Sequence, residues 1–134
     1  MIHESAIIDQ SAKIADNVEI GAYSIIDKNV CISEGTVIKE NAIIRENTKI
    51  GKNNLIYQFA TIGEVPQDLK FQNEKTTCTI GDNNTFREYC SIHRGTSDGI
   101  SDTKIGNENL FMAYTHVAHD CTIENNCILS NAAS

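Results

Sequence analysis

Isoleucine recurs every six residues along most of the chain. It stands at eleven successive positions with this spacing: 2, 8, 14, 20, 26, 32, 38, 44, 50, 56 and 62. The same phase returns at Ile80, Phe86 and Ile92, then slips by one residue and continues through Ile105, Phe111, Val117, Ile123 and Leu129. Two residues before most of these positions lies a small side chain, such as Ala42 or Ala60, with Asn54 an exception. This pattern indicates two inward positions per repeat.

A period of six fits neither an α-helix, with a period of 3.6, nor a long flat strand, with a period of two. It is typical of a coil with three short strands and three corners, about eighteen residues per turn, whose successive turns pair as parallel strands. We therefore predict an all-β fold of about seven stacked triangular coils, forming a single domain over residues 1–134. Its core is predicted to be a column of aliphatic side chains.

The predicted corners are rich in Asn and Gly, which tolerate a left-handed backbone better than other residues. We expect such corners at Asn17, Asn29, Asn41, Asn47, Asn53, Asn83, Asn125 and Asn126, and at Gly21, Gly51, Gly63, Gly81 and Gly106.

Composition excludes several classes of protein. The net charge is −7 and no basic cluster is present, which argues against nucleic-acid binding because phosphate contacts require grouped Lys and Arg. No apolar run is long enough for a membrane span, and the first residues lack the pattern of a signal peptide. We therefore expect a cytoplasmic protein.

The five cysteines do not predict a disulfide framework, because their number is odd and no secretory signal precedes them. Four of them stand two residues before an inward aliphatic: Cys78, Cys90, Cys121 and Cys127. At that position cysteine serves as a small hydrophobic residue, so we expect these four in the core.

The repeat is interrupted twice. The first interruption runs from Gly63 to Thr79 and contains the single proline, Pro66. The second lies between His93 and Lys104. Because insertions in a repeat protein become loops on one side of the stack and often carry function, we predict two projecting loops that mark the functional site.

Three histidines lie near these interruptions. His93 directly follows an inward isoleucine, whereas His116 and His119 bracket Val117 and Ala118 and should point outward or toward a corner. Zinc ligands, a general base and surface residues without a role are all open readings. In zinc-binding hexapeptide-repeat enzymes, four residues separate the paired ligands. Only two residues separate His116 and His119, so we expect no metal site. Asp120 is a possible partner of His119, although neighbouring strand residues point to opposite faces.

Three segments are more specific than the repeat. They are Gly63–Phe71 (Gly-Glu-Val-Pro-Gln-Asp-Leu-Lys-Phe), Arg87-Glu88 followed by Ser91–Thr96 (Ser-Ile-His-Arg-Gly-Thr), and His116–Cys121 (His-Val-Ala-His-Asp-Cys). Through these segments the whole chain resembles the UDP-N-acetylglucosamine O-acyltransferase family of lipid A biosynthesis. The resemblance implies a left-handed coil, which departs from the usual right-handed crossover. It also implies a homotrimer with active sites between neighbouring chains.

The resemblance further implies transfer of a 3-hydroxyacyl chain from acyl carrier protein to the 3-hydroxyl of UDP-N-acetylglucosamine. His119 would be the general base and Asp120 would orient it. The residues implied to line the substrate site are Gln67, Asp68, Lys70, His93 and His116. No cofactor is expected, because the thioester of the donor is already activated.

Members of the resembled family are about twice as long, with further coils, a helical carboxy-terminal region and an oxyanion-stabilising amide past the position of Ser134. We therefore expect the chain to be an incomplete piece of such an enzyme. Two alternatives stay open. One is a trimeric scaffold without turnover, and the other is a hexapeptide acyltransferase with a different donor or acceptor.

Overall fold

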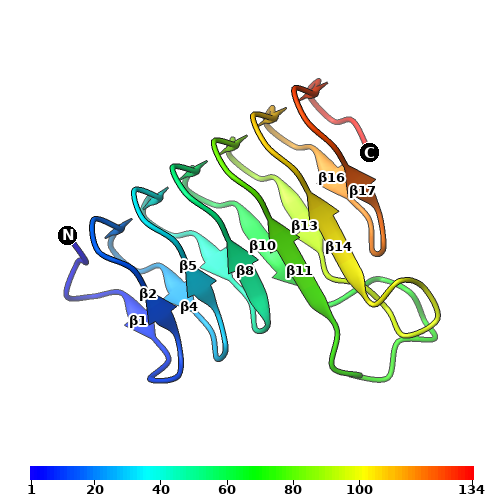
Figure 1. Cartoon of the computed structure of the whole chain (residues 1–134), viewed down its shortest axis with the longest axis horizontal. Helices are drawn as coiled ribbons and strands as arrows, with labels where there is room; N and C mark the ends of the chain where they lie inside the picture. The colour runs from blue at the N-terminus through cyan, green and yellow to red at the C-terminus, as the bar shows by residue number, and fades with distance from the viewer.

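The computed structural model describes residues 1–134 and consists of short strands joined by corners and loops (Figure 1). Eighteen strands form three parallel sheets of six strands each, wound as a left-handed β-helix. Consecutive strands along the chain belong to different sheets, and each strand pairs with the strand three elements later. The two chain ends lie at opposite ends of the stack (Figure 1). The predicted fold class is confirmed.

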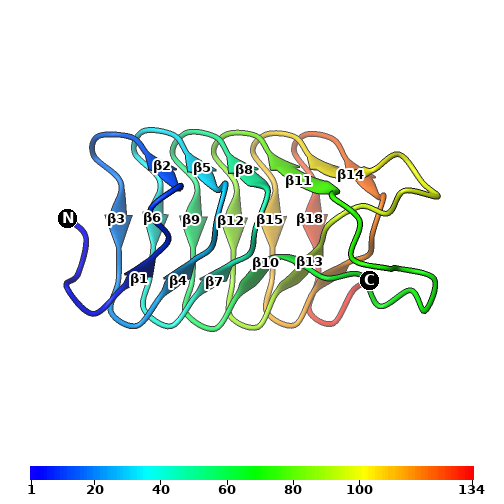
Figure 2. The same ribbon diagram turned by 90° about the horizontal axis from the view of Figure 1, so that it is seen from below.

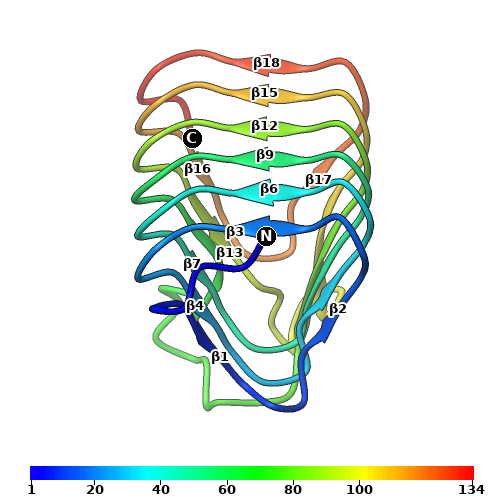
Figure 3. The same cartoon turned by 90° about the vertical axis from the view of Figure 1, so that its left-hand side faces the viewer.

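The three sheets are the three faces of a prism. The first face comprises β1 (Ile7–Ile8), β4 (Ile25–Ile26), β7 (Ile43–Ile44), β10 (Thr61–Glu64), β13 (Ser91–His93) and β16 (His116–Val117). The second face comprises β2 (Lys13–Ile14), β5 (Cys31–Ile32), β8 (Thr48–Ile50), β11 (Thr77–Ile80), β14 (Asp102–Ile105) and β17 (Thr122–Ile123). The third face comprises β3 (Glu19–Ile20), β6 (Val37–Ile38), β9 (Leu55–Ile56), β12 (Thr85–Phe86), β15 (Leu110–Phe111) and β18 (Ile128–Leu129). Figures 2 and 3 show the third face as a ladder from β3 to β18.

Six complete coils are present, with a partial rung at each end. Ile2 forms a single parallel bridge to Ile20, and the His116 backbone N–H donates to the Ala133 carbonyl. The predicted number of about seven coils is therefore close to the observed stack.

The core is the predicted aliphatic column. Twenty buried hydrophobic residues form one continuous cluster, in which Ile44, Ile62 and Phe86 are fully buried. Phe86 stacks on Phe111 of the next coil with ring centroids 4.7 Å apart. A fully buried side chain of this size contributes about 1.5–3 kcal/mol, so the regular rungs supply the stability that a globular core would otherwise provide.

The corners follow one rule. In almost every repeat the third residue after the inward aliphatic has a positive φ, and asparagine is the commonest residue there. The rule also applies to less tolerant residues, among them Tyr23, Phe59, Tyr89 and Tyr114. The prediction of positive φ is wrong for Asn125, Gly21, Gly51, Gly81 and Gly106. These four glycines instead lie so close to the next coil that an added Cβ would collide with it.

Two of the cysteines meet the expectation of burial. Cys78 and Cys90 are buried in the core, and burial raises the pKa of both thiols. The prediction is wrong for Cys121, which is exposed, and only partly right for Cys127, which is half-buried. Cys121 directly precedes β17 and Cys127 directly precedes β18, the last two strands. All five thiols are free.

Both interruptions form projecting loops, as predicted. The first loop joins β10 to β11 (residues 65–76) and the second joins β13 to β14 (residues 94–101). Each therefore replaces a corner between the first and the second face, in successive coils. Figures 1 and 2 show the two loops projecting from the same side of the prism.

Candidate active site

The first loop and the first face enclose one hollow. Its volume is about 330 Å³, and its lining residues are Gln67, Asp68, His93, His116, Ala118 and His119. Gln67 and Asp68 come from the first loop, whereas the histidines come from the ends of β13 and β16 and the corner after β16. The fold thus brings together five of the seven residues predicted for the site, from segments more than 20 positions apart.

His116 is oriented by a hydroxyl group. Its Nδ1 lies 2.7 Å from Ser91 Oγ, because Ser91 and His116 are partners in the β13–β16 register. The His93 ring meets the His116 ring edge to face, with centroids 4.5 Å apart. Burial, together with the positive charge that His116 and His119 would carry, lowers the pKa of His93 to about 4 despite the opposing effect of Glu64. His93 is therefore neutral at pH 7.

His119 is backed by a carboxylate. Its Nδ1 lies 2.8 Å from Asp120 Oδ2. Asp120 is a corner residue with φ of 62°, so alternation along a strand does not apply and the two neighbouring side chains turn toward each other. Burial would raise the pKa of Asp120, but hydrogen bonds from Thr96 and His119 outweigh it and hold that pKa below its ordinary value. The carboxylate is ionised and accepts the His119 Nδ1–H, which leaves Nε2 as the proton acceptor.

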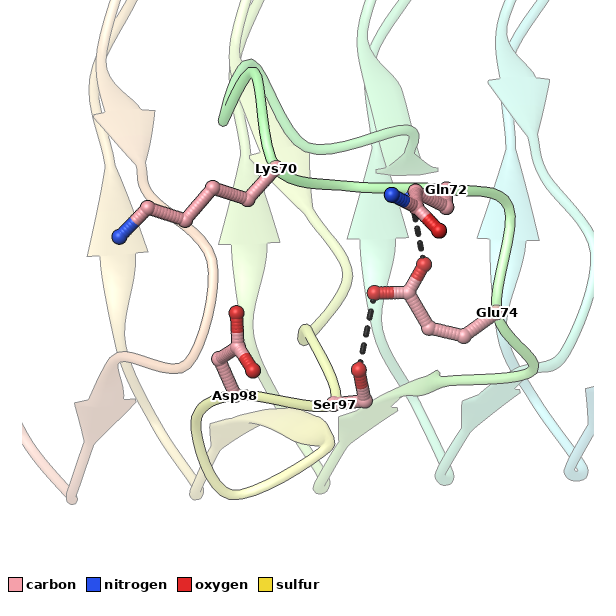
Figure 4. Close-up of a pocket in the computed structure, with 5 residues that line it drawn as sticks. All are labelled: Lys70, Gln72, Glu74, Ser97 and Asp98. Carbon is pink, nitrogen blue, oxygen red and sulfur yellow. Dashed lines mark hydrogen bonds between the residues drawn. The ribbon is translucent and has the colours of Figure 1, made fainter.

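Lys70 lies outside this hollow. It is exposed and lines a second, wholly polar hollow of about 490 Å³ together with Gln72, Glu74, Ser97 and Asp98. Figure 4 shows its side chain extending away from Glu74 and Ser97. Its backbone N–H donates to Asp68 Oδ1 at 3.0 Å, so Lys70 contributes to the shape of the first loop.

A charged row supports His93 from the preceding coils. Glu64 faces His93 in the β10–β13 register, and Arg45 Nε donates to Glu64 Oε1 at 3.0 Å. The same guanidinium reaches Asp27 Oδ2 at 3.3 Å. Burial opposes ionisation of Glu64, but hydrogen bonds from the Val65 N–H and Arg45 hold its pKa below the ordinary value. The ionised Glu64 carboxylate therefore lies beside the neutral His93, in the preceding coil.

Sequence reasoning did not assign roles to Ser91 and Thr96. The contact of Ser91 with His116 could have been predicted from the repeat. Both residues directly precede an inward aliphatic of the first face and must therefore be neighbours. Thr96 carries no such signal. It lies in the second loop, where the repeat no longer indicates which side chains meet.

The arrangement suits proton transfer. An imidazole whose Nδ1 is held by a carboxylate, and whose other nitrogen is free to face a hollow lined by polar groups, can accept a proton from a bound hydroxyl. No group of three or more His, Cys, Asp or Glu side chains is arranged to hold a metal ion. The structure also has no helix that is long and apolar enough to cross a membrane.

Comparison with known proteins agrees with the geometry. The sequence model of the bacterial transferase hexapeptide family (six repeats) matches residues 102–133. The acyl-[acyl-carrier-protein]–UDP-N-acetylglucosamine O-acyltransferase of Aliarcobacter butzleri is 55% identical over 133 residues, which are 99% of this chain and 51% of that protein. The enzyme of the same name from Neisseria gonorrhoeae is 52% identical over 134 residues, covering 100% of this chain and 52% of that protein.

Solved structures give the same result. The crystal structure of UDP-N-acetylglucosamine O-acyltransferase from Moraxella catarrhalis superimposes with a TM-score of 0.93 at 53% identity, over 96% of this chain and 50% of that one. The chain thus spans about half the length of the relatives that it matches. The similarity extends over nearly all of this chain, and the chain belongs to the UDP-N-acetylglucosamine O-acyltransferase family of hexapeptide-repeat proteins.

Proposed function

We propose that the protein transfers a 3-hydroxyacyl chain from acyl carrier protein to the 3-hydroxyl of UDP-N-acetylglucosamine, in the biosynthesis of lipid A. The observation that carries this proposal is the His119–Asp120 pair, 2.8 Å apart, at the edge of a hollow that also contains Gln67 and Asp68. The names of the relatives supply the donor and the acceptor.

In this reaction His119 Nε2 takes the proton of the acceptor hydroxyl as the oxygen attacks the thioester carbonyl. The C–S bond then breaks, and the departing thiolate takes the proton back from the imidazolium. Asp120 stabilises the imidazolium while it exists, because its carboxylate accepts the Nδ1–H. No covalent acyl-enzyme is required, since the bound hydroxyl is the nucleophile.

The remaining residues of the hollow are assigned to binding. Asp68 and Gln67 offer acceptors and donors to sugar hydroxyl and amide groups. His93 and His116 are placed to hydrogen-bond the substrate, and His93 does so as a neutral ring because its pKa is about 4. Lys70 projects from the same loop into solvent, where its ammonium group can meet the diphosphate of the nucleotide.

A homotrimer is part of the proposal, and the exposed apolar side chains support it. The corner between the third and the first face presents Tyr23, Phe59, Tyr89 and Tyr114, each about half-exposed or more. Outward residues flank this corner on the third face (Val37, Leu55, Leu110 and Ile128) and on the first face (Ile7, Ile25 and Ile43). The second face instead presents Lys13, Lys49 and Lys104. A second copy packed on this apolar side would form another wall of the hollow lined by the histidines, because His116 points outward on the first face.

A cytoplasmic location completes the proposal. All five cysteines are free, which is the usual state in a reducing compartment.

The test is an acyl-transfer assay on a chimera in which residues 1–134 replace the matching half of the Neisseria gonorrhoeae relative. We expect turnover of UDP-N-acetylglucosamine with 3-hydroxyacyl carrier protein, and a fall in kcat of about 10²–10⁴-fold in His119→Ala. His3→Ala is the matched control, because His3 is exposed at the other end of the prism. A chimera whose His119→Ala variant keeps normal turnover would rule out the assigned base.

Two further outcomes would identify the alternatives. An unsubstituted chimera that trimerises but shows no turnover would support a scaffold role. Turnover with acetyl-CoA and none with acyl carrier protein would indicate a different acyltransferase. Asp68→Ala should weaken substrate use and leave the oligomeric state unchanged in light scattering; loss of the trimer would assign Asp68 to assembly instead.

A further inference from the structure

The second loop wraps around the Asp120 carboxylate. Thr96, which is 3% exposed, donates its backbone N–H to Oδ1 at 2.9 Å and its hydroxyl to Oδ2 at 2.6 Å. The Gly99 N–H donates to the same hydroxyl oxygen at 3.2 Å. The hydroxyl group therefore receives one hydrogen bond and directs its own proton at the carboxylate, which makes a short charge-assisted contact.

The backbone of Gly99 packs directly against the Asp120 carboxylate. A Cβ at this position would fall within 2.6 Å of Asp120 Oδ1 and closer still to the rest of the group. The φ of Gly99 lies outside the left-handed region, so the backbone alone would accept alanine. Glycine is needed here because the loop passes so near to a side chain of another coil.

The backbone of Asp120 is held as well. Its N–H donates to the hydroxyl of Thr103 at 2.9 Å, and Thr103 is fully buried in β14. Asp120 is consequently fixed at both its main chain and its side chain, in a corner conformation with φ of 62°. Since Oδ2 contacts both Thr96 and His119, any movement of the carboxylate moves the partner of the imidazole.

We propose that Thr96 and Gly99 form a socket whose role is to position Asp120, and through it to fix His119 with its proton on Nδ1 and Nε2 free. They are positioning residues, because neither touches the hollow itself. The second loop would thereby position the general base, His119, whereas the first loop supplies the binding groups Gln67 and Asp68. The catalytic part of this inference rests on the proposed function; the effect on the imidazole does not.

The alternative is that the carboxylate merely caps the loop and stabilises it. In that case the loop depends on Asp120 and His119 is indifferent to Thr96. The two readings differ in what happens to the imidazole when the hydroxyl is removed but the shape of the side chain is kept.

The deciding measurement is the ¹⁵N NMR spectrum of the imidazole nitrogens at neutral pH, in the whole chain and its variants. We expect the wild type to show His119 protonated on Nδ1. Thr96→Val should give a mixture of tautomers, Thr96→Ser should restore the wild-type spectrum, and Gly99→Ala should resemble Thr96→Val. Thr85→Val, on the outward side of β12 and far from the hollow, is the matched control. An unchanged His119 tautomer in Thr96→Val, with the fold intact, would overturn the socket.

Kinetics of the chimera described above separate this inference from the proposed function. Thr96→Val should lower kcat about tenfold, the effect of one hydrogen bond to a charged group, with little change in KM. If the spectra change as expected and the wild-type chimera has no activity, the socket stands and the proposed function fails. If the chimera is active and neither the spectrum nor kcat responds to Thr96→Val, the socket fails and the proposed function stands.

Discussion

Asn54 and Asn84 lie one above the other inside the prism, and the Asn54 Oδ1 accepts hydrogen bonds from both the backbone N–H and the Nδ2 of Asn84, at 2.9 and 3.0 Å. Asn84 repeats the pattern, since its Oδ1 accepts the Asn109 backbone N–H at 2.9 Å and its Nδ2 donates to the Gly106 carbonyl at 2.8 Å. All three asparagines are nearly fully buried. They form a polar ladder that fixes the register of successive coils.

We predict that Asn84→Ala lowers the free energy of unfolding by about 3 kcal/mol. The change removes three side-chain hydrogen bonds and leaves buried partners, such as the Asn109 N–H, without an acceptor. Urea unfolding followed by circular dichroism measures the loss. Thr85→Ala, at the outward position next to Asn84, is the control and should change stability by less than about 0.5 kcal/mol. A cost for Asn84→Ala no greater than that of the control would show that the ladder contributes nothing.

The core could be read from the sequence because its period is unbroken. Ile44 and Ile62 belong to the six-residue series and are both fully buried, as predicted. The asparagine ladder was accessible to the same reasoning, because Asn54, Asn84 and Asn109 each stand two residues before an inward residue. Asparagine is also the commonest corner residue, so its presence alone does not distinguish these three inward positions from the corners.

The candidate site was only partly predictable. The motifs placed His119 and Asp120 together, although the alternation of a strand argued against contact, and the left-handed corner at Asp120 resolves that conflict. The contact from Thr96 could not be predicted, because it depends on the path of a loop that has no repeat. The six-residue repeat predicts which side chains are neighbours only where the coil is regular.

A second test concerns Gly63, which lies in β10 just before the first loop, and Thr48 of β8. Gly63 has φ of 81°, and a Cβ there would collide with the Thr48 hydroxyl, which is itself buried without a hydrogen-bond partner. We predict that Gly63→Ala destabilises the protein by about 2–3 kcal/mol, through both the positive φ and the collision.

A double-mutant cycle separates the two causes. Thr48→Ala removes the colliding hydroxyl, so the double variant should recover at least about 1 kcal/mol relative to the sum of the single changes. Thermal or urea unfolding of the four proteins gives the coupling energy. Strictly additive effects would mean that the backbone conformation alone requires glycine at position 63.

Arg94 tests whether charge or packing matters beneath the first loop. Its side chain is 6% exposed, its guanidinium lies over the Phe71 ring at 5.7 Å, and its Nη1 is 3.6 Å from Glu46 Oε1. Its Nε has no partner. Because this ion pair is long and incompletely satisfied, we predict that Arg94→Met changes stability by less than about 1 kcal/mol, whereas Arg94→Ala costs about 2–3 kcal/mol.

Glu46 remains paired in either variant, because Lys28 Nζ lies 3.5 Å from its other oxygen. Unfolding in urea again provides the measurement. Arg94→Met and Arg94→Ala proving equally destabilising would show that the guanidinium charge, and not the volume of the side chain, holds the loop.

His93 should make the stability of the fold depend on pH. Its pKa is about 4 in the folded protein, against an ordinary value of 6.5, because burial and the neighbouring His116 and His119 disfavour its charged form more than Glu64 favours it. Between these two values the unfolded chain binds a proton at this position and the folded chain does not. Stability contributed by the neutral ring is therefore complete above about pH 6.5 and is lost as the pH falls toward 4.

Each unit of difference in pKa corresponds to about 1.4 kcal/mol, so we expect the wild type to lose about 2–3 kcal/mol from this group between pH 7.5 and 4.5. In His93→Gln that part of the loss should disappear, whatever the stability of the variant at pH 7.5. The lowered pKa values of Asp120 and Glu64 also make the fold less stable in acid, but the wild type and His93→Gln share that contribution. His3→Gln controls for a solvent-exposed histidine. Urea unfolding curves at the two pH values decide the matter, since an equal acid loss in wild type and His93→Gln would mean that His93 takes up its proton in the folded protein as readily as in the unfolded chain.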